Sequence, residues 1–163
     1  MTRRCCLAAA LCWAAFARGA DWPQFRGTNA SGVSDATKLP VEFGPDRNVI
    51  WKVRLPFGHS SPVIHGDLVY LWVGPGERQV LVALDKKTGH EVWRHEEPGG
   101  HGGLKKGDPW VGSWSTPVVA KIGDHEELIL SVPKKLKGFD PKTGKELWHC
   151  DGLTDLVYTS PVV

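Results

Sequence analysis

The chain contains an internal repeat, and this repeat constrains the fold more than any single motif does. Residues 82–93 and 137–148 align without a gap, 55 positions apart. The positions that match are Asp85, Thr88, Gly89 and Trp93 in the first copy and Asp140, Thr143, Gly144 and Trp148 in the second. Repeats of this length indicate an architecture in which each unit buries one face against the next.

A second motif opens each unit. Ser61-Pro62-Val63 stands upstream of the first copy, Thr116-Pro117-Val118 stands at the same spacing upstream of the second, and residues 159–162 begin a third opening. We therefore expect about two whole units and partial ones, with the remaining units of the array supplied by sequence beyond residue 163.

Each unit has the pattern of four short strands. The apolar and β-branched runs are residues 63–64, 68–73, 80–84 and 90–96 in the first unit, and 116–121, 128–132, 136–139 and 145–149 in the second. Glycine, proline and aspartate separate these runs, as is typical of hairpins. Four antiparallel strands per unit predict the blades of an all-β propeller. A further strand is expected over residues 49–53, with Trp51 as the docking residue of a neighbouring blade.

The Asp-x-x-Thr-Gly element has a local structural cause. Asp85 and Asp140 are expected to accept hydrogen bonds from N–H groups two or three residues later, and Gly89 and Gly144 to take a positive φ where the strand resumes. The tryptophan that follows each glycine is large enough to cover the neighbouring blade. We interpret all these repeat positions as structural rather than ligand-binding.

The repeat resembles the tryptophan-docking repeat of the pyrroloquinoline quinone (PQQ)-type β-propellers. Residues 83–93 follow the pattern Ala-x-Asp-x-x-Thr-Gly-x-x-x-Trp, and the second copy departs from it only in placing Gly138 where alanine is usual. The stretch 21–27, Asp-Trp-Pro-Gln-Phe-Arg-Gly, is similar to the start of secreted bacterial proteins of this class. The resemblance implies that residues 21–163 are the N-terminal part of a propeller. It does not imply a chemistry, because the repeat is shared by quinone-dependent dehydrogenases and by scaffolds such as the lipoprotein of the outer-membrane barrel assembly machinery.

The first 20 residues have the pattern of a signal peptide. Arg3 and Arg4 precede an apolar run over residues 5–17, and small residues favour cleavage near Ala17 or Ala20. The run is shorter than the roughly 20 residues that a membrane-spanning helix needs. The sequence therefore predicts a secreted or periplasmic protein without a transmembrane anchor.

Charge and motif content exclude several function classes. Removing Arg3 and Arg4 with the signal lowers the formal net charge from +2 to zero, so no nucleic-acid partner is expected. Only Cys150 lies outside the signal, which leaves no internal disulfide. No zinc-protease motif, nucleophile elbow or phosphate loop is present. We therefore predict no catalytic, cofactor-binding or metal-binding residue in this chain.

The longest connection is the best candidate for a functional element. From Trp93 to Pro117 the chain is 11 residues longer than from Trp148 to Pro161, and the excess falls over residues 98–110. This loop is expected on the face opposite the Thr-Gly turns, and long loops on rigid scaffolds often carry function. Its candidate ligand residues are His101, Lys105, Asp108 and Trp110.

Two function classes remain open from the sequence. The favoured one is a secreted, non-enzymatic binding or scaffold module with a protein or polysaccharide partner. The alternative is the N-terminal part of a PQQ- and calcium-dependent alcohol or sugar dehydrogenase. In that case the stacking tryptophan, the metal ligands and the catalytic aspartate would lie in blades encoded beyond residue 163.

Overall fold

The computed structural model describes residues 21–37, 39–74, 78–100 and 110–163, and these residues form one short 3-10 turn and ten strands. The turn is η1 (Thr28–Ala30). The strands are β1 (Val63–His65), β2 (Leu68–Val73), β3 (Arg78–Asp85), β4 (Glu91–Pro98), β5 (Gly112–Ser113), β6 (Val118–Ile122), β7 (His125–Val132), β8 (Lys135–Phe139), β9 (Glu146–Asp151) and β10 (Leu156–Val157). No helix within these ranges is long and apolar enough to cross a membrane.

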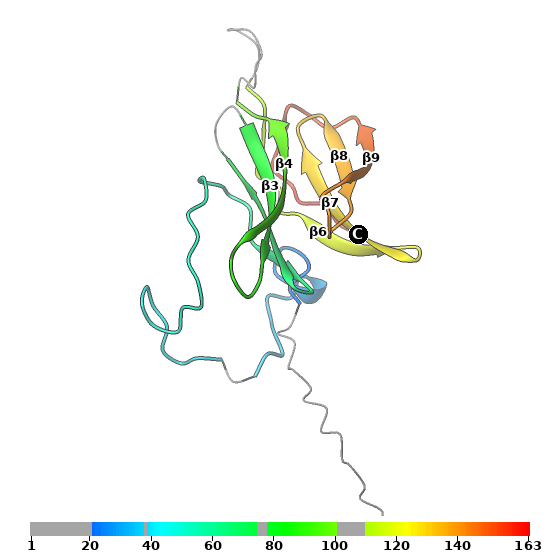
Figure 1. The fold of residues 1–163 in the computed structure, drawn as a ribbon. Helices are drawn as coiled ribbons and strands as arrows, with labels where there is room; N and C mark the ends of the chain where they lie inside the picture. The colour runs from blue at the N-terminus through cyan, green and yellow to red at the C-terminus, as the bar shows by residue number, and fades with distance from the viewer. Residues whose placement is uncertain (1–20, 38, 75–77, 101–109) are drawn as a thin grey trace, which may run out of the picture.

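Two antiparallel sheets of four strands dominate the structure (Figure 1). Their strand orders are β1-β2-β3-β4 and β6-β7-β8-β9, which we call blade 1 and blade 2. The predicted all-β, four-stranded units are confirmed, and both blades carry a register shift at the same place, between Ala83 and Leu84 and between Gly138 and Phe139. A short parallel pair, β5 with β10, lies on the remaining connections.

The core lies between the two blades. Apolar side chains from both sheets form one buried cluster: Val63, Tyr70, Trp72, Leu81, Ala83, Trp93, Val119, Leu128, Leu130, Val132 and Phe139. The strand patterns explain it, because β2 and residues 128–130 of β7 are apolar on successive positions and are largely covered on both faces. Each blade therefore buries itself against its neighbour, as a repeat architecture requires.

The antiparallel order fixes two opposite faces of the blades. The β1–β2 hairpins and the Thr-Gly turns lie at one end of the strands, which we call the turn face. The end of β2, the start of β3, the β7–β8 connection and the ends of β4 and β9 lie at the other end, which we call the loop face. In Figure 1 the loop-face ends of β3 and β4 are uppermost.

One predicted strand is wrong. Residues 49–53 form no strand, because among the described residues no sheet edge lies alongside them to accept their backbone hydrogen bonds. Trp51 nevertheless docks on blade 1. Its Nε1 donates to the carbonyl oxygen of Lys86 at 2.9 Å, and its ring lies against Gly89.

The segment around residues 21–27 lies along the inner strands of both blades. The N–H and C=O of Trp22 exchange hydrogen bonds of 2.7 and 2.9 Å with Ile64 of β1, and the carbonyl oxygen of Pro23 accepts from Val119 of β6 at 2.8 Å. The segment thus ties the two blades together at their inner edge.

Candidate functional site

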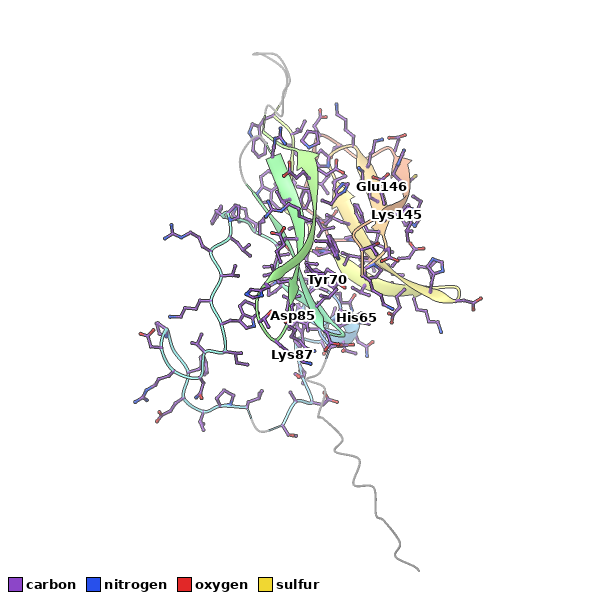
Figure 2. All side chains as sticks on the ribbon, viewed as in Figure 1. His65, Tyr70, Asp85, Lys87, Lys145 and Glu146 are labelled. Atoms are coloured by element: carbon purple, nitrogen blue, oxygen red, sulfur yellow. The ribbon has the colours of Figure 1, made fainter. Side chains whose placement is uncertain are left out.

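The two Thr-Gly turns have the same hydrogen-bond geometry. Asp85 Oδ1 accepts from the N–H groups of Lys87 and Thr88 at 3.0 and 2.7 Å and from Thr88 Oγ1 at 2.8 Å. Hydrogen bonds from Thr88 hold the pKa of Asp85 below its usual value. Asp140 makes the equivalent contacts in the second copy. Figure 2 shows Asp85 and Lys87 at the turn face of blade 1.

The glycine of each turn is where a tryptophan of the preceding repeat lies. Trp93 Nε1 donates to the carbonyl oxygen of Pro141 at 3.0 Å, and its ring covers Gly144, where an added Cβ would lie 2.4 Å from a ring carbon. Gly144 has a φ of +71°, which only glycine adopts readily. Trp51 makes the same contact with the first turn, so this tryptophan joins each blade to the next.

Trp148 has a different environment. It is half-buried against Gly138 of its own blade, and its Nε1 donates to Glu127 at 2.5 Å. The described residues contain no third Thr-Gly turn for it to cover.

The candidate loop is only partly described. His101, Lys105 and Asp108 lie outside the described residues. Gly100 and Val111, which flank them, exchange two backbone hydrogen bonds of 2.8 Å, so both ends of the connection meet at one place on the loop face. Trp110 is described and packs on Trp114, with ring centroids 5.5 Å apart.

Trp110 belongs to a row of aromatic side chains. Three of its members, His59, Trp114 and Tyr158, stand three residues before the proline of successive opening motifs. Tyr158 stacks on Trp114 at 4.7 Å with an interplanar angle of 3°, and the ring centroid of His59 lies 6.3 Å from that of Trp114. Phe57 meets His59 edge-on at 4.8 Å. We call these five residues the aromatic row.

The aromatic row is open to solvent. Phe57 is 63% exposed, Tyr158 67% and Trp110 37%, whereas the central Trp114 is half-buried. Contiguous exposed aromatic surface of this kind usually marks an interaction site. The sequence analysis missed four of the five residues because it weighed loop length and charge, although the aromatic-x-x-Pro spacing was available.

Hydroxyl groups set the spacing of the row from one repeat to the next. The N–H of Ser61 donates to Thr116 Oγ1 at 3.1 Å, and the N–H of Thr116 donates to Ser160 Oγ at 2.9 Å. These residues precede the motif prolines, so each repeat satisfies an N–H of the one before it. The aromatic residues two positions earlier are thereby held in fixed order along the loop face.

A buried amide fixes the backbone next to Trp114. Gln79 Nε2 donates to the carbonyl oxygen of Ser113 and Gln79 Oε1 accepts from its N–H, both at 2.9 Å. Trp72 Nε1 donates to the same carbonyl at 2.9 Å, and Ser113 Oγ donates to Ser131 at 2.6 Å. Blade 1 and blade 2 both contribute to this clamp, which makes the centre of the row rigid.

The one group of described residues with metal-ligand types is His95, Glu97 and Glu146, whose ligand atoms lie within 4.8 Å of one another. Lys137, 8% exposed, contacts Glu97 and lies 3.0 Å from Glu146. Burial alone would raise the pKa of Glu97, but hydrogen bonds from His95 and Lys137 outweigh it and lower that pKa. The Lys137 ammonium therefore supplies the positive charge that a metal ion would supply.

A polar cleft of about 920 Å³ opens on the turn face between the blades. His65, which Figure 2 labels, lies there between Asp21, 3.2 Å from Nδ1, and Glu126, 2.9 Å from Nε2. Tyr70 donates from its hydroxyl to Pro141 at 3.1 Å, and burial raises the pKa of Tyr70. His65 of blade 1 and Glu126 of blade 2 thus contact each other across the blade interface.

Comparison with known proteins identifies the repeat. A family model of PQQ repeats, described as outer membrane protein assembly factor BamB, matches residues 33–152, which include both blades and the base of the long connection. No curated protein matches the chain. The match covers more than half of the sequence and agrees with the two four-stranded blades. The chain belongs to this family of PQQ-repeat propeller proteins.

Proposed function

We propose that this chain is a secreted, non-enzymatic binding module whose loop face engages a protein or polysaccharide partner. The observation that carries the proposal is the aromatic row, which is exposed and rigid at once. Aromatic residues contribute much of the binding energy at recognition surfaces because they bury large areas with few rotatable bonds. Secretion is supported by the signal-peptide pattern of residues 1–20.

The preformed geometry of the row supports recognition. Its side chains come from three successive repeats, and the contacts of Gln79 and Thr116 hold their backbone in place. A partner that covers the row therefore pays little entropy for ordering this surface.

Asp85, Asp140 and Lys137 have contacts that support a structural role. Asp85 and Asp140 accept hydrogen bonds from their own turns, and Lys137 is held between two carboxylates. These contacts account for the three side chains as parts of the fold.

The dehydrogenase alternative requires a calcium site, and the best cluster of described residues does not fit one. Calcium takes six to eight oxygen ligands. Glu97 and Glu146 already bind the ammonium of Lys137, and a calcium ion beside it would meet like charge. A fluorescence titration of the full chain with PQQ and calcium tests this point. We expect no saturable quenching at micromolar quinone, and saturable quenching would favour the dehydrogenase.

A comparison of ligand binding by two variants tests the proposed binding module. The full chain would be immobilised, and peptides from a random display library and a panel of soluble polysaccharides would be passed over it. Trp110→Ala should weaken whatever binds, whereas Phe43→Ala should not. Phe43 is 78% exposed and takes part in none of the ring contacts that define the row. Equal binding by both variants would overturn the proposed site.

A further inference from the structure

We propose that His65 is a proton-dependent clasp, which ties the N-terminal segment and the two blades together more strongly when its imidazole ring is protonated. The inference goes beyond the proposed function and concerns the turn face, at the opposite end of the strands from the aromatic row. It rests on the two acceptors that the ring contacts, on the elements that hold them and on the charges of the surrounding cleft.

The ring of His65 contacts a carboxylate at each of its nitrogens. Asp21 Oδ2 lies 3.2 Å from Nδ1, and Glu126 Oε2 lies 2.9 Å from Nε2. An ionised carboxylate only accepts hydrogen bonds, and a neutral imidazole carries a hydrogen on just one nitrogen. With a neutral ring, one of the two contacts therefore brings a nitrogen lone pair against a carboxylate oxygen. The protonated ring donates from both nitrogens, so this arrangement complements the imidazolium.

The main chain holds the first acceptor in place. The two backbone hydrogen bonds between Trp22 and Ile64 set the N-terminal segment beside β1. The N–H of Gly66 then donates to Asp21 Oδ1 at 3.0 Å, which leaves Oδ2 for the ring of His65. The position of this carboxylate is thus supported by backbone groups whose hydrogen bonds do not depend on the protonation of the ring.

The second acceptor belongs to the other blade. Glu126 lies near the start of β7 and pairs with Lys121 of β6 in the register of blade 2. The side chain of His65 is 23% exposed, so both of its contacts are partly shielded from water. Because the two acceptors come from different elements, a proton on the ring acts on the joint between these elements and not on a single turn.

Negative charge around the cleft favours a cation at His65. Lys86 donates to the carbonyl oxygen of Gly66. The other titratable groups that line the cleft with His65 are Asp21, Asp67, Tyr70, Lys121, Asp124, His125, Glu126, Asp140 and Lys142. Burial raises the pKa of Tyr70, which Figure 2 labels beside His65, and the charges of Glu126, Asp140 and Asp21 raise that pKa further. Charges that disfavour a further anion at Tyr70 attract a cation nearby.

The sign of the pH effect follows from these contacts. A proton that the folded chain binds more tightly than the unfolded chain stabilises the fold as the pH falls. Histidine changes its charge between about pH 5 and pH 8, whereas carboxyl groups lose theirs near about pH 4. The clasp should therefore strengthen from about pH 8 to about pH 6, above the range in which the carboxylates that contact it are protonated.

Urea unfolding of the full chain at about pH 8 and about pH 6 tests the inference. Glu126→Gln is the informative variant, because its amide can donate to the bare nitrogen of a neutral ring and so keeps the contact without the proton. Between these pH values the unfolding equilibrium constant of the wild type should fall about fivefold more than that of the variant, the upper end for a partly exposed ion pair. Asp21→Asn makes the same change at the other nitrogen and should also reduce the pH dependence.

Asp124→Asn is the matched control. It removes a carboxylate that lines the same cleft but makes neither of the two ring contacts, so it should keep nearly the pH dependence of the wild type. An unchanged pH dependence in both Glu126→Gln and Asp21→Asn would overturn the inference. A loss in Asp124→Asn as large as in Glu126→Gln would also overturn it, because the general charge of the cleft would then be responsible. Neither result concerns the aromatic row, so the proposed function is tested separately.

Discussion

Replacing Trp93 by alanine tests how the two blades hold together. Trp93 is 9% exposed, covers Gly144 of blade 2 and packs against Tyr70, with ring centroids 5.9 Å apart. Truncating a buried tryptophan to alanine costs about 3–5 kcal/mol. The lost hydrogen bond adds little, because Tyr70 also donates to the carbonyl oxygen of Pro141 and keeps it satisfied. We therefore expect the low end of this range.

Chemical denaturation measures the effect. The free energy of unfolding of the full chain would be followed in urea by far-ultraviolet circular dichroism. A loss of about 3 kcal/mol is a large fraction of the 5–15 kcal/mol that typical domains possess. Trp110→Ala is the matched control, since Trp110 is 37% exposed, and should cost under about 1 kcal/mol. If the two substitutions proved equally costly, docking of Trp93 would not be what holds the blades together.

Three further predictions concern the same interfaces and use thermal or urea unfolding. Gly144→Ala should destabilise more than Gly123→Ala, because both glycines have positive φ but an added Cβ meets Trp93 only at Gly144. Stability should fall as the pH drops below the ordinary carboxyl pKa of about 4.3. Glu97 and Glu146, which contact Lys137, have lowered pKa values in the folded protein, so protons bind the unfolded chain more readily and favour unfolding; Lys137→Met should reduce this dependence. Gln79→Ala should cost about 1–3 kcal/mol, since it leaves the buried N–H of Ser113 without its acceptor; an unchanged unfolding midpoint would contradict the clamp.

The sequence predicted the blades well because their signals are local. Apolar runs separated by glycine, proline and aspartate define strands without reference to distant residues, and the structure places strands at all eight predicted positions of the two units. Residues 49–53 failed because a strand needs a partner edge, which no local pattern supplies. The contact of Trp22 with Ile64 could not be predicted for the same reason.

The candidate site was predicted less well, for a different reason. The prediction selected one connection by its length, and only Trp110 of its four candidates lies within the described residues. The aromatic row combines histidine, tryptophan and tyrosine, so it does not stand out as a repeated residue type. What repeats is a position relative to proline, and that becomes informative only once the opening motifs are known to lie side by side.

The position of the aromatic row separates binding from stability. The contacts that join the blades lie at the turn face, where Trp51 and Trp93 cover Gly89 and Gly144, and in the core between the sheets. The exposed members of the row lie at the opposite end of the strands and belong to neither buried cluster of the core. Substitutions there can change what is bound at small cost to folding, because surface residues away from cores and caps contribute little to stability. Among the row, Trp114 takes part both in the exposed aromatic surface and in the packing of the blades, since it is half-buried and follows the clamped Ser113. A change at Trp114 should therefore affect binding and unfolding together, whereas changes at Tyr158 and Trp110 should affect binding alone.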